Sequence, residues 1–300
     1  MKKTSSRKSP AKKSSSAPKN NSSAPPLVLP KTIQKRDGTF EIFTLEKISN
    51  AIFKAMVNIG VEDETKAKTY AEEVVHELNL VLKPKEIPTV EGTQDIVEKV
   101  LIEAGEVRLA RAYITYRENR AALRREKQQT LEREIINEVD KSFDLNAIRV
   151  LKSRYFEKDE EGKLIEGPKD LFQRVAIHVY LPTLLYETRF FQKKGKIKHP
   201  EESFNPTAYE HKIKIGPYSF NRFHLEGLKR VYDRLNDAGC MRHPWSKVLK
   251  TLLKNNLDNH AQKITEFYDL MRFKRFLPNT PALANFGRSL GMGSACFVLG

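Results

Sequence analysis

The 300-residue sequence predicts a mostly α-helical protein with one small β-hairpin near its N-terminus. Along most of the chain, apolar residues recur at the three- and four-residue spacing of amphipathic helices. The hairpin is predicted by Asp37-Gly38, which separates two short stretches of alternating apolar and polar residues. No apolar run approaches the ~18 residues that a membrane-spanning helix needs, so a transmembrane protein is excluded.

Composition excludes further classes of protein. The chain has only two cysteines, Cys240 and Cys296, so neither a disulfide framework nor a zinc site built from thiolates is expected. We also expect no metal site built from the histidines around Cys240, because Cys240-x-x-His243 supplies two ligands where a structural zinc needs four. The N-terminus lacks the apolar core of a secretory signal, and a cytoplasmic protein is therefore expected.

The first 30 residues differ sharply from the rest. They carry seven basic and no acidic residues, and so supply +7 of the formal net charge of +15. Eight Ser and five Pro complete a composition that cannot bury a core, which predicts a disordered tail over 1–30. The tail either solubilises the protein or binds nucleic acid weakly through its charge.

A compact domain is expected over 31–120. Its hairpin joins strands at 32–36 and 39–43 through a type I′ turn, for which Asp37 and Gly38 supply the two positive-φ positions. Four helices follow: one capped by Thr44 and ended by Gly60, one over about 63–79, one capped by Thr89, and one over about 107–126. Their predicted buried stripes comprise Ile48, Ile52, Ala55 and Ile59, then Ala67, Tyr70, Ala71, Val74 and Leu78, then Ile96, Val97, Val100 and Leu101.

An ordered motif within this domain resembles the opening of the ATP-cone domain. It runs from Ile33 through Lys35-Arg36-Asp37-Gly38 to Lys47-Ile48, and later pieces at 87–90 and 110–117 also fit. The resemblance implies that ATP or dATP binds here as an allosteric effector. The contacts that it implies are Ile33, Lys35, Arg36, Glu41, Lys47, Ile48 and Thr89. Elementary chemistry agrees, because a triphosphate needs several cations converging on one surface.

The chain then passes through a polar linker helix over 121–144 into a mainly helical domain over 145–300. The pattern Asn146-Ala147 to Arg154-Tyr155, followed by Arg174-Val175-Ala176, resembles the start of the catalytic domain of ribonucleotide reductase. Pro168 is expected to open a helix over 169–180 that buries Leu171, Phe172, Val175, Ala176 and Val179. The polar, basic segment 190–225 departs from the family pattern and is interpreted as an insertion.

The C-terminal motif indicates the chemistry. Pro278-Asn279-Thr280-Pro281, followed by Ser294-Ala295-Cys296-Phe297, resembles the first strand region of the ten-stranded α/β reductase barrel, most closely that of the adenosylcobalamin-dependent class. The resemblance implies that Thr280 contacts the substrate phosphate, Ala295 flanks the substrate and Cys296 is one of the two reducing thiols. The segment from Leu283 to Leu299 is expected to begin the barrel, with Cys296 at the start of an apolar strand.

By the same resemblance, the complete enzyme uses adenosylcobalamin, held outside these residues, reduces ribonucleotides, takes electrons from a thioredoxin-like protein and forms homo-oligomers. Its radical cysteine, Glu, Asn and second reducing cysteine should lie beyond Cys296. We therefore expect this chain to be inactive alone and to work with a complementary C-terminal polypeptide. Two alternatives stay open: a non-catalytic ATP-sensing regulatory module, and a nucleic-acid-binding protein that uses the basic tail.

Overall fold

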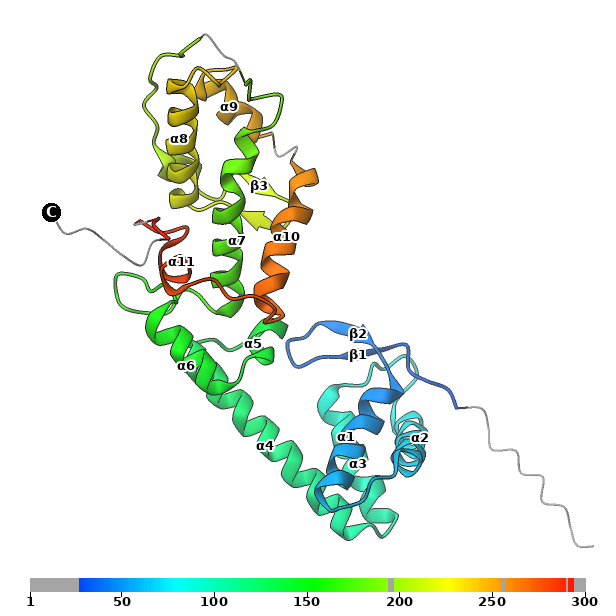
Figure 1. Cartoon of the computed structure of the whole chain (residues 1–300). Helices are drawn as coiled ribbons and strands as arrows, with labels where there is room; N and C mark the ends of the chain where they lie inside the picture. The colour runs from blue at the N-terminus through cyan, green and yellow to red at the C-terminus, as the bar shows by residue number, and fades with distance from the viewer. Residues whose placement is uncertain (1–26, 194–196, 255–256, 290, 294–300) are drawn as a thin grey trace, which may run out of the picture. The chain divides into compact units, whose positions relative to one another are not determined.

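A computed structural model describes residues 27–193, 197–254, 257–289 and 291–293 (Figure 1). The chain forms two compact units, which meet in the sequence between Glu118 and Asn119. Helix α4 (Val107–Leu131) begins in the first unit and ends in the second. The described residues are mostly helical, with two separate two-stranded antiparallel sheets.

The first unit is a helical bundle with a hairpin. Its elements are β1 (Thr32–Gln34), β2 (Phe40–Ile42), α1 (Leu45–Asn58), α2 (Glu64–Val81), α3 (Val90–Glu103) and the start of α4. Ile33 lies opposite Glu41 in the antiparallel register of the hairpin. Helix α2 packs against both α1 and α3, so it forms the centre of the bundle.

Of the three residues at the N-cap positions of α1, α2 and α3, two accept a capping hydrogen bond through their side chains. The Asp63 carboxylate accepts from Lys66 N at 2.8 Å, and the Thr89 hydroxyl accepts from Gly92 N at 3.0 Å. The predicted cap at Thr44 is wrong in one respect: the residue occupies the N-cap position of α1, but its side chain makes no capping bond. Its hydroxyl is buried without a hydrogen-bond partner among the described residues.

The hairpin turn is not the predicted type I′ turn. Gly38 has a φ of +80°, whereas Asp37 has no positive φ. Gly38 N donates to Lys35 O at 3.0 Å, and Lys35 N donates to Thr39 O at 2.7 Å, which closes a three-residue loop. This is a type I turn followed by one left-handed residue, so one glycine suffices where type I′ needs two positive-φ residues.

The predicted stripes of the first unit form its core. All five predicted residues of α2 are buried, as are Ile48, Ile52 and Ala55 of α1 and Val97, Val100 and Leu101 of α3. Ile59 and Ile96 are partly buried and pack against this cluster. The 3.6-residue period therefore located the core of the bundle correctly.

The last residues of the tail predicted over 1–30 belong to the described part of the chain. Asn79 Nδ2 donates to Val28 O at 2.7 Å, so the backbone at 28 lies against α2. Residues 1–26 lie outside the described part of the chain. Leu27, Val28 and Leu29 are apolar and differ from the polar sequence before them, and the disorder of the tail stays a prediction.

The second unit is built around the long helix α7 (Pro168–Leu185), which packs against α8, α10 and the short α5 and α11. Figure 1 shows α7 running between α8 and α10. The other elements are α5 (Glu138–Ser142), α6 (Leu145–Arg154), η1 (Pro206–Tyr209), β3 (Lys214–Ile215), β4 (Tyr218–Ser219), α8 (Arg222–Asp237), α9 (Trp245–Leu252), α10 (Asp258–Arg272) and α11 (Thr280–Asn285).

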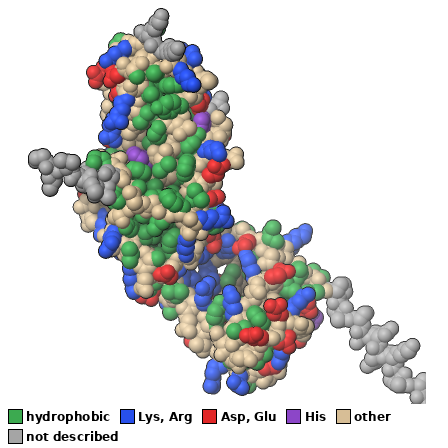
Figure 2. Space-filling view, in the orientation of Figure 1, with side chains coloured by type: hydrophobic (Ala, Val, Ile, Leu, Met, Phe, Trp, Pro, Cys, Tyr) green, Lys and Arg blue, Asp and Glu red, His purple; other side chains and the backbone are tan. Residues whose placement is uncertain are grey.

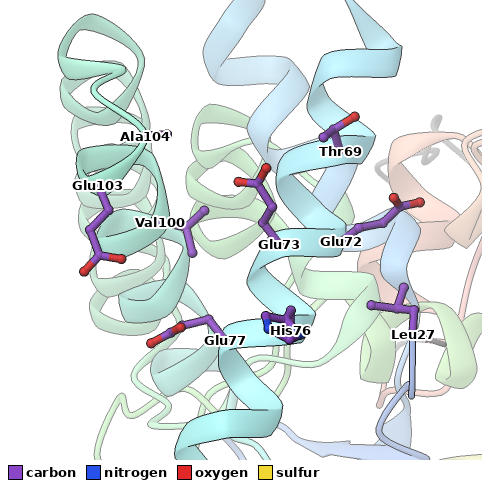
Figure 3. Close-up of a pocket in the computed structure, with 9 residues that line it drawn as sticks. All are labelled: Leu27, Thr69, Glu72, Glu73, His76, Glu77, Val100, Glu103 and Ala104. Carbon is purple, nitrogen blue, oxygen red and sulfur yellow. The ribbon is translucent and has the colours of Figure 1, made fainter. Parts of the chain in front are cut away.

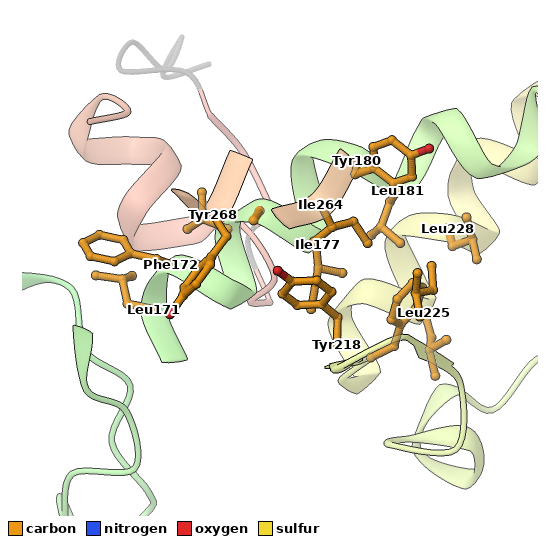
Figure 4. Close-up of a cluster of buried hydrophobic side chains, with 14 of the residues drawn as sticks. Leu171, Phe172, Ile177, Tyr180, Leu181, Tyr218, Leu225, Leu228, Ile264 and Tyr268 are labelled. Carbon is orange, nitrogen blue, oxygen red and sulfur yellow. The ribbon is translucent and has the colours of Figure 1, made fainter. Parts of the chain in front are cut away.

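The core of this unit lies where α7, α8, α10 and β4 meet (Figure 4). Leu171, Phe172, Val175 and Ala176 are buried as predicted, but Val179 is 40% exposed. Helix α7 continues to Leu185 through Pro182, so Ile177, Tyr180 and Leu181 continue the buried face instead.

Segment 190–225 is part of this core, which the interpretation as a polar insertion missed. Phe190, Ile213, Ile215, Tyr218 and Phe220 are all buried in the same cluster as α7. Ile213 and Ile215, then Tyr218 and Phe220, alternate with other residues on the two sides of Gly216-Pro217, so they show the two-residue period of a hairpin and no helical period. The short β3–β4 hairpin brings several of them onto α10.

The region 121–144 is not one helix. Helix α4 ends at Leu131, Glu132 adopts a φ of +52°, and the short α5 follows. Lys127 is 6% exposed and donates to Lys141 O at 3.0 Å, so its ammonium binds a carbonyl at the end of α5. Burial lowers the pKa of Lys127. The division of the chain into tail, cone, linker and catalytic domain stays a prediction.

The segment expected to begin the barrel opens as a helix, because Leu283 to Asn285 belong to α11. The barrel itself stays a prediction. Asn279 caps this helix by accepting from Ala282 N at 3.2 Å, and Pro281 suits its first turn. Residues 294–299 lie outside the described part of the chain.

Within the described ranges, no helix combines the length and apolar character needed to cross a bilayer. Figure 2 shows hydrophobic side chains gathered on one face of the second unit, with Lys and Arg side chains along its edges.

The packing of α7 predicts a contrast between two truncations on the same helix. Phe172→Ala should lower the free energy of unfolding by about 3–5 kcal/mol, because it leaves a cavity at a fully buried position. Val179→Ala should change it by no more than about 0.5 kcal/mol, because Val179 is exposed. Urea unfolding followed by circular dichroism measures both, and equal losses would contradict this account of the core.

Candidate functional site

Two lysines of the first unit share one carboxylate. Glu41 on β2 forms an ion pair with Lys35 of the hairpin loop at 3.0 Å, and another with Lys47 in the first turns of α1. Hydrogen bonds from Lys47 and then Lys35 lower the pKa of Glu41. The hairpin and the start of α1 thus bring together three of the residues predicted from the sequence.

Arg36 lies in the same loop and reaches the first turns of α3. Its guanidinium pairs with Glu91 and donates to Gln94 Oε1 at 3.0 Å. Sequence reasoning missed Glu91 and Gln94. The signal was available, because the Thr89 cap fixes the start of α3 and so places both side chains in its first two turns.

Thr89 is held beside the hairpin. Gln34 N donates to Pro88 O at 2.8 Å, and Gln34 forms a parallel bridge with Thr89. Strand β1 therefore has β2 on one edge and the start of α3 on the other. Ile33 is partly buried and Ile48 is 8% exposed, and both belong to the apolar core beneath the charged residues. All seven predicted effector contacts thus come from the hairpin, the start of α1 or the start of α3.

A second concave surface in this unit has the opposite charge. A groove of about 560 Å³ between α2 and α3 is lined by Glu72, Glu73, Glu77 and Glu103, with His76 beside them. Figure 3 shows these carboxylates on facing helices. Lys99 pairs with Glu77, and it approaches Glu103 at 3.9 Å. Carboxylates repel phosphate groups, so the hairpin surface is the better candidate for binding a nucleotide.

In the second unit, Thr280 is the first residue of α11. Its hydroxyl lies 3.1 Å from the hydroxyl of Tyr155. Tyr155 ends the sequence pattern that resembles the start of the reductase domain, to which no chemistry had been assigned. The structure therefore connects the two motifs through a hydrogen bond between residues 125 positions apart.

Behind Thr280 lies a buried ion pair. Arg174 on α7 pairs with Glu166 through two hydrogen bonds, at 2.5 Å and 3.0 Å, and both side chains are less than a tenth exposed. The same guanidinium donates to the carbonyls of Phe286 and Leu283. Arg174 thus fixes the backbone at the end of α11 to the centre of the unit.

A second arginine completes this network. Arg288 donates to Glu166 Oε2 at 3.2 Å, to Tyr155 O at 2.9 Å and to Ala284 O at 3.2 Å. Burial lowers the pKa of Arg288, and its Nε is buried without a partner among the described residues. Glu166 therefore pairs with two arginines. Both arginines also donate to backbone carbonyls in α11 or directly after it.

One histidine holds the segment after α11, and a second lies against it. Gly287 N donates to His178 Nδ1 at 3.0 Å, and His224 Nε2 lies 3.0 Å from Arg174 O. Gly287 has a φ of +73°, and a Cβ there would lie 2.5 Å from Arg174 Cγ and 2.6 Å from His224 Nε2. Only glycine fits this close approach.

Two of the predicted catalytic-site residues, Ala295 and Cys296, lie outside the described part of the chain. The other cysteine, Cys240, is half-buried, and its thiol lies 3.5 Å from Ala238 O. Across the described ranges, no group of three or more His, Cys, Asp or Glu side chains is arranged to hold a metal ion.

Comparison with known families gives two matches in the expected order. The ATP cone domain family matches residues 31–122, and the all-alpha domain of ribonucleotide reductase matches residues 141–291, about half of the chain. The chain belongs to the ribonucleotide reductase family.

Relatives of this reductase chain include B12-dependent enzymes. It is 34% identical over 274 residues to a vitamin B12-dependent ribonucleoside-diphosphate reductase of Thermoplasma acidophilum, a match that covers 90% of this chain and 33% of the relative. A protein of the same description from Mycobacterium tuberculosis H37Rv is 28% identical over 270 residues, covering 90% and 27%. An anaerobic ribonucleoside-triphosphate reductase of Haemophilus influenzae is 30% identical over 177 residues, covering 57% and 23%.

The reductase chain spans about a third of the length of the first of these relatives. The resemblance to the N-terminal part of a reductase, and to the B12-dependent class, is confirmed. The effector contacts and the roles of Thr280, Ala295 and Cys296 stay predictions.

The buried histidines predict acid sensitivity of the second unit of this reductase chain. Burial lowers the pKa of His178 to about 4 and that of His224 to about 3, against an ordinary value of 6.5. Below pH 6.5 the unfolded chain takes up protons that the folded chain does not, so stability is lost as the pH falls toward 3.

Replacing His224 should reduce this loss. His224→Gln keeps a donor and an acceptor but cannot take up a proton, so its melting temperature should fall less between pH 7 and pH 4 than that of the parent chain. The control is His76→Gln, at an exposed position of α2, which should follow the parent. Parallel melting curves for the His224 variant and the parent would contradict the prediction.

Proposed function

We propose that this chain is the effector-sensing and substrate-phosphate-binding part of a ribonucleotide reductase. The observation that carries the proposal is the convergence of Lys35 and Lys47 on Glu41 within an ATP cone domain. ATP or dATP is the proposed effector. The match to the reductase all-alpha domain favours this function over a free-standing ATP-sensing module.

The effector site acts by exchange of ion-pair partners. Without nucleotide, Glu41 neutralises Lys35 and Lys47, and Glu91 neutralises Arg36. A triphosphate offers more negative charge than a carboxylate, and it accepts hydrogen bonds from several cations at once. Binding therefore transfers the lysines to phosphate, and Glu41 becomes available to accept hydrogen bonds from the ribose hydroxyls. Thr89, at the start of α3, borders the same site.

Lys35→Ala should weaken ATP binding to the full chain by at least about tenfold, because one charge-assisted phosphate contact contributes about 1.5–3 kcal/mol. The fold should persist, because Glu41 keeps Lys47 as a partner. Isothermal titration calorimetry measures the affinity. Lys54→Ala, an exposed lysine on α1, is the control and should bind as the parent does. Equal affinity for the Lys35 variant, or no binding by the parent, would reject the proposed site.

On the substrate side, Thr280 is the proposed phosphate contact. Its hydroxyl is oriented by Tyr155, and its backbone is held through Arg174, Arg288 and Glu166. This support fits a residue that must present one hydroxyl in a fixed position. Ala295 is the proposed neighbour of the substrate.

Cys296 is proposed as one of two thiols that reduce the ribose. Two thiols form one disulfide and give up two electrons and two protons, so the 2′-hydroxyl leaves as water and a hydrogen takes its place. The second thiol, the radical-generating residues and a thioredoxin-like reductant are assigned to the complete enzyme. Adenosylcobalamin, implied by the B12-dependent relatives, would supply the radical when bound. We assign no described residue to it and route no step through it.

In any preparation that contains this chain and reduces ribonucleotides, Cys296→Ser should abolish deoxyribonucleotide formation, because a hydroxyl cannot form the disulfide. Cys240→Ser is the matched control and should keep the activity of the parent. Product formation is measured chromatographically. Full activity of the Cys296 variant would remove this residue from the mechanism.

A further inference from the structure

A basic cavity in the second unit shares Arg288 with the network around Thr280 but belongs to neither proposed site. It has a volume of about 340 Å³ and lies beside the end of α6 and the loop after α11. Its lining comprises Lys152, Ser153, Arg154, Phe156, Glu157, Lys158, Phe223, Arg288 and Ser289. Four cations and two serine hydroxyls thus border one space. Its volume is at the lower end of the roughly 300–1,000 Å³ found for ligand sites.

The simplest explanation covers only part of this lining. Lys152 and Arg154 close α6, where cations offset the partial negative charge of a helix C-terminus. Lys152 is also tied to Glu132 at 2.7 Å and to Thr130 O at 2.9 Å. Lys158 and Arg288 come from other segments, so neither of them offsets the charge at the end of α6. Capping of α6 therefore does not account for the convergence of charge.

The donors that remain point to an anion. Arg154 and Lys158 are exposed and make no ion pair within 4 Å among the described residues, although Lys158 acts on Glu132 at longer range. Arg288 also lines the cavity; its Nη atoms donate to Ala284 O, Tyr155 O and Glu166, and its Nε is buried with no acceptor in the described part of the chain. Glu157 is the opposing charge on the lining, and burial raises its pKa.

We propose that this cavity binds a small phosphate anion, in the form of pyrophosphate or the diphosphate of a nucleotide, through Arg154, Lys158 and Arg288. Guanidinium groups match phosphate oxygens in geometry and charge, and serine hydroxyls add neutral donors. The cavity is connected to Thr280 through one residue, because Arg288 binds the carbonyl of Tyr155 and the Tyr155 hydroxyl meets Thr280. The proposal is independent of the effector site on the hairpin.

The test uses the full chain carrying Lys35→Ala and Arg36→Ala, so that binding at the hairpin is reduced. Pyrophosphate is titrated in 50 mM and 300 mM NaCl, and hydrogen exchange is followed by mass spectrometry. We expect protection of peptides covering 152–158 and 286–289, with weaker binding at the higher salt. Protection confined to 33–47 or to the tail would overturn the proposal.

A variant that also carries Arg154→Ser and Lys158→Ser supplies the second arm. Both residues are exposed, so the fold should be unaffected, and the affinity measured at 152–158 should fall by about tenfold or more. Lys250→Ser, an exposed lysine on α9, is the matched control and should leave the affinity unchanged. Equal affinity in the double variant and the control would refute the site.

Titration with CDP and ADP distinguishes the source of the phosphate. Protection of 152–158 by a nucleoside diphosphate at concentrations similar to pyrophosphate identifies a nucleotide site. Protection by pyrophosphate alone identifies a site for the free anion.

Discussion

The buried pair between Arg174 and Glu166 is the interaction on which the second unit depends. Glu166 lies just before helix α7, eight positions from Arg174, and the same arginine binds the carbonyls of Leu283 and Phe286, 109 and 112 positions away. An unpaired charge at this depth would be strongly unfavourable, and removal of one partner of a buried pair typically costs about 3–5 kcal/mol. Arg288 adds a second cation to the same carboxylate. The geometry around Thr280 therefore follows from the requirement to neutralise and hydrogen-bond one buried glutamate.

Unlike the buried pair of the second unit, the ion pairs around the hairpin of the first unit are exposed. Its lysines and carboxylates lie at the surface around the hairpin, where water screens each pair and a single pair contributes little to stability. Exposed pairs of this kind can exchange partners at low cost, whereas the pair at Arg174 cannot. The exposed pairs around the hairpin are thus the ones whose partners a ligand could replace. The buried pair at Arg174 keeps its partners and holds the backbone in place.

Periodicity in the sequence predicted the helices and most of the core, because burying one face of a helix dictates a 3.6-residue pattern. It failed in segment 190–225, where the buried residues do not follow a helical period. Ile213 and Ile215, then Tyr218 and Phe220, alternate with other residues as in a hairpin, and only the folded chain shows that they share one core. The turn at Asp37-Gly38 was predicted at the right place with the wrong backbone conformation, because the same dipeptide suits loops of two and three residues.

The residues of the candidate sites likewise divide into those that the sequence predicted and those that only the fold shows. Lys35, Arg36, Glu41 and Lys47 were found from a motif whose residues are close in sequence, and β1 and β2 bring them together directly. The contact between Tyr155 and Thr280, and the roles of His178 and His224, depend on long-range packing that spacing alone does not encode. Arg174 was noted as part of a pattern, but its partners became evident only from the fold.

The shared carboxylate of Glu41 also bears on selectivity among anions. An ammonium that already has a carboxylate partner gains little from a singly or doubly charged phosphate, because one ion pair merely replaces another. A triphosphate brings enough charge to displace the carboxylate from both lysines at once. In the proposed effector site, Glu41 would therefore set a threshold against abundant small anions, and the hairpin would favour nucleotides with a long phosphate chain before any contact with the base is made.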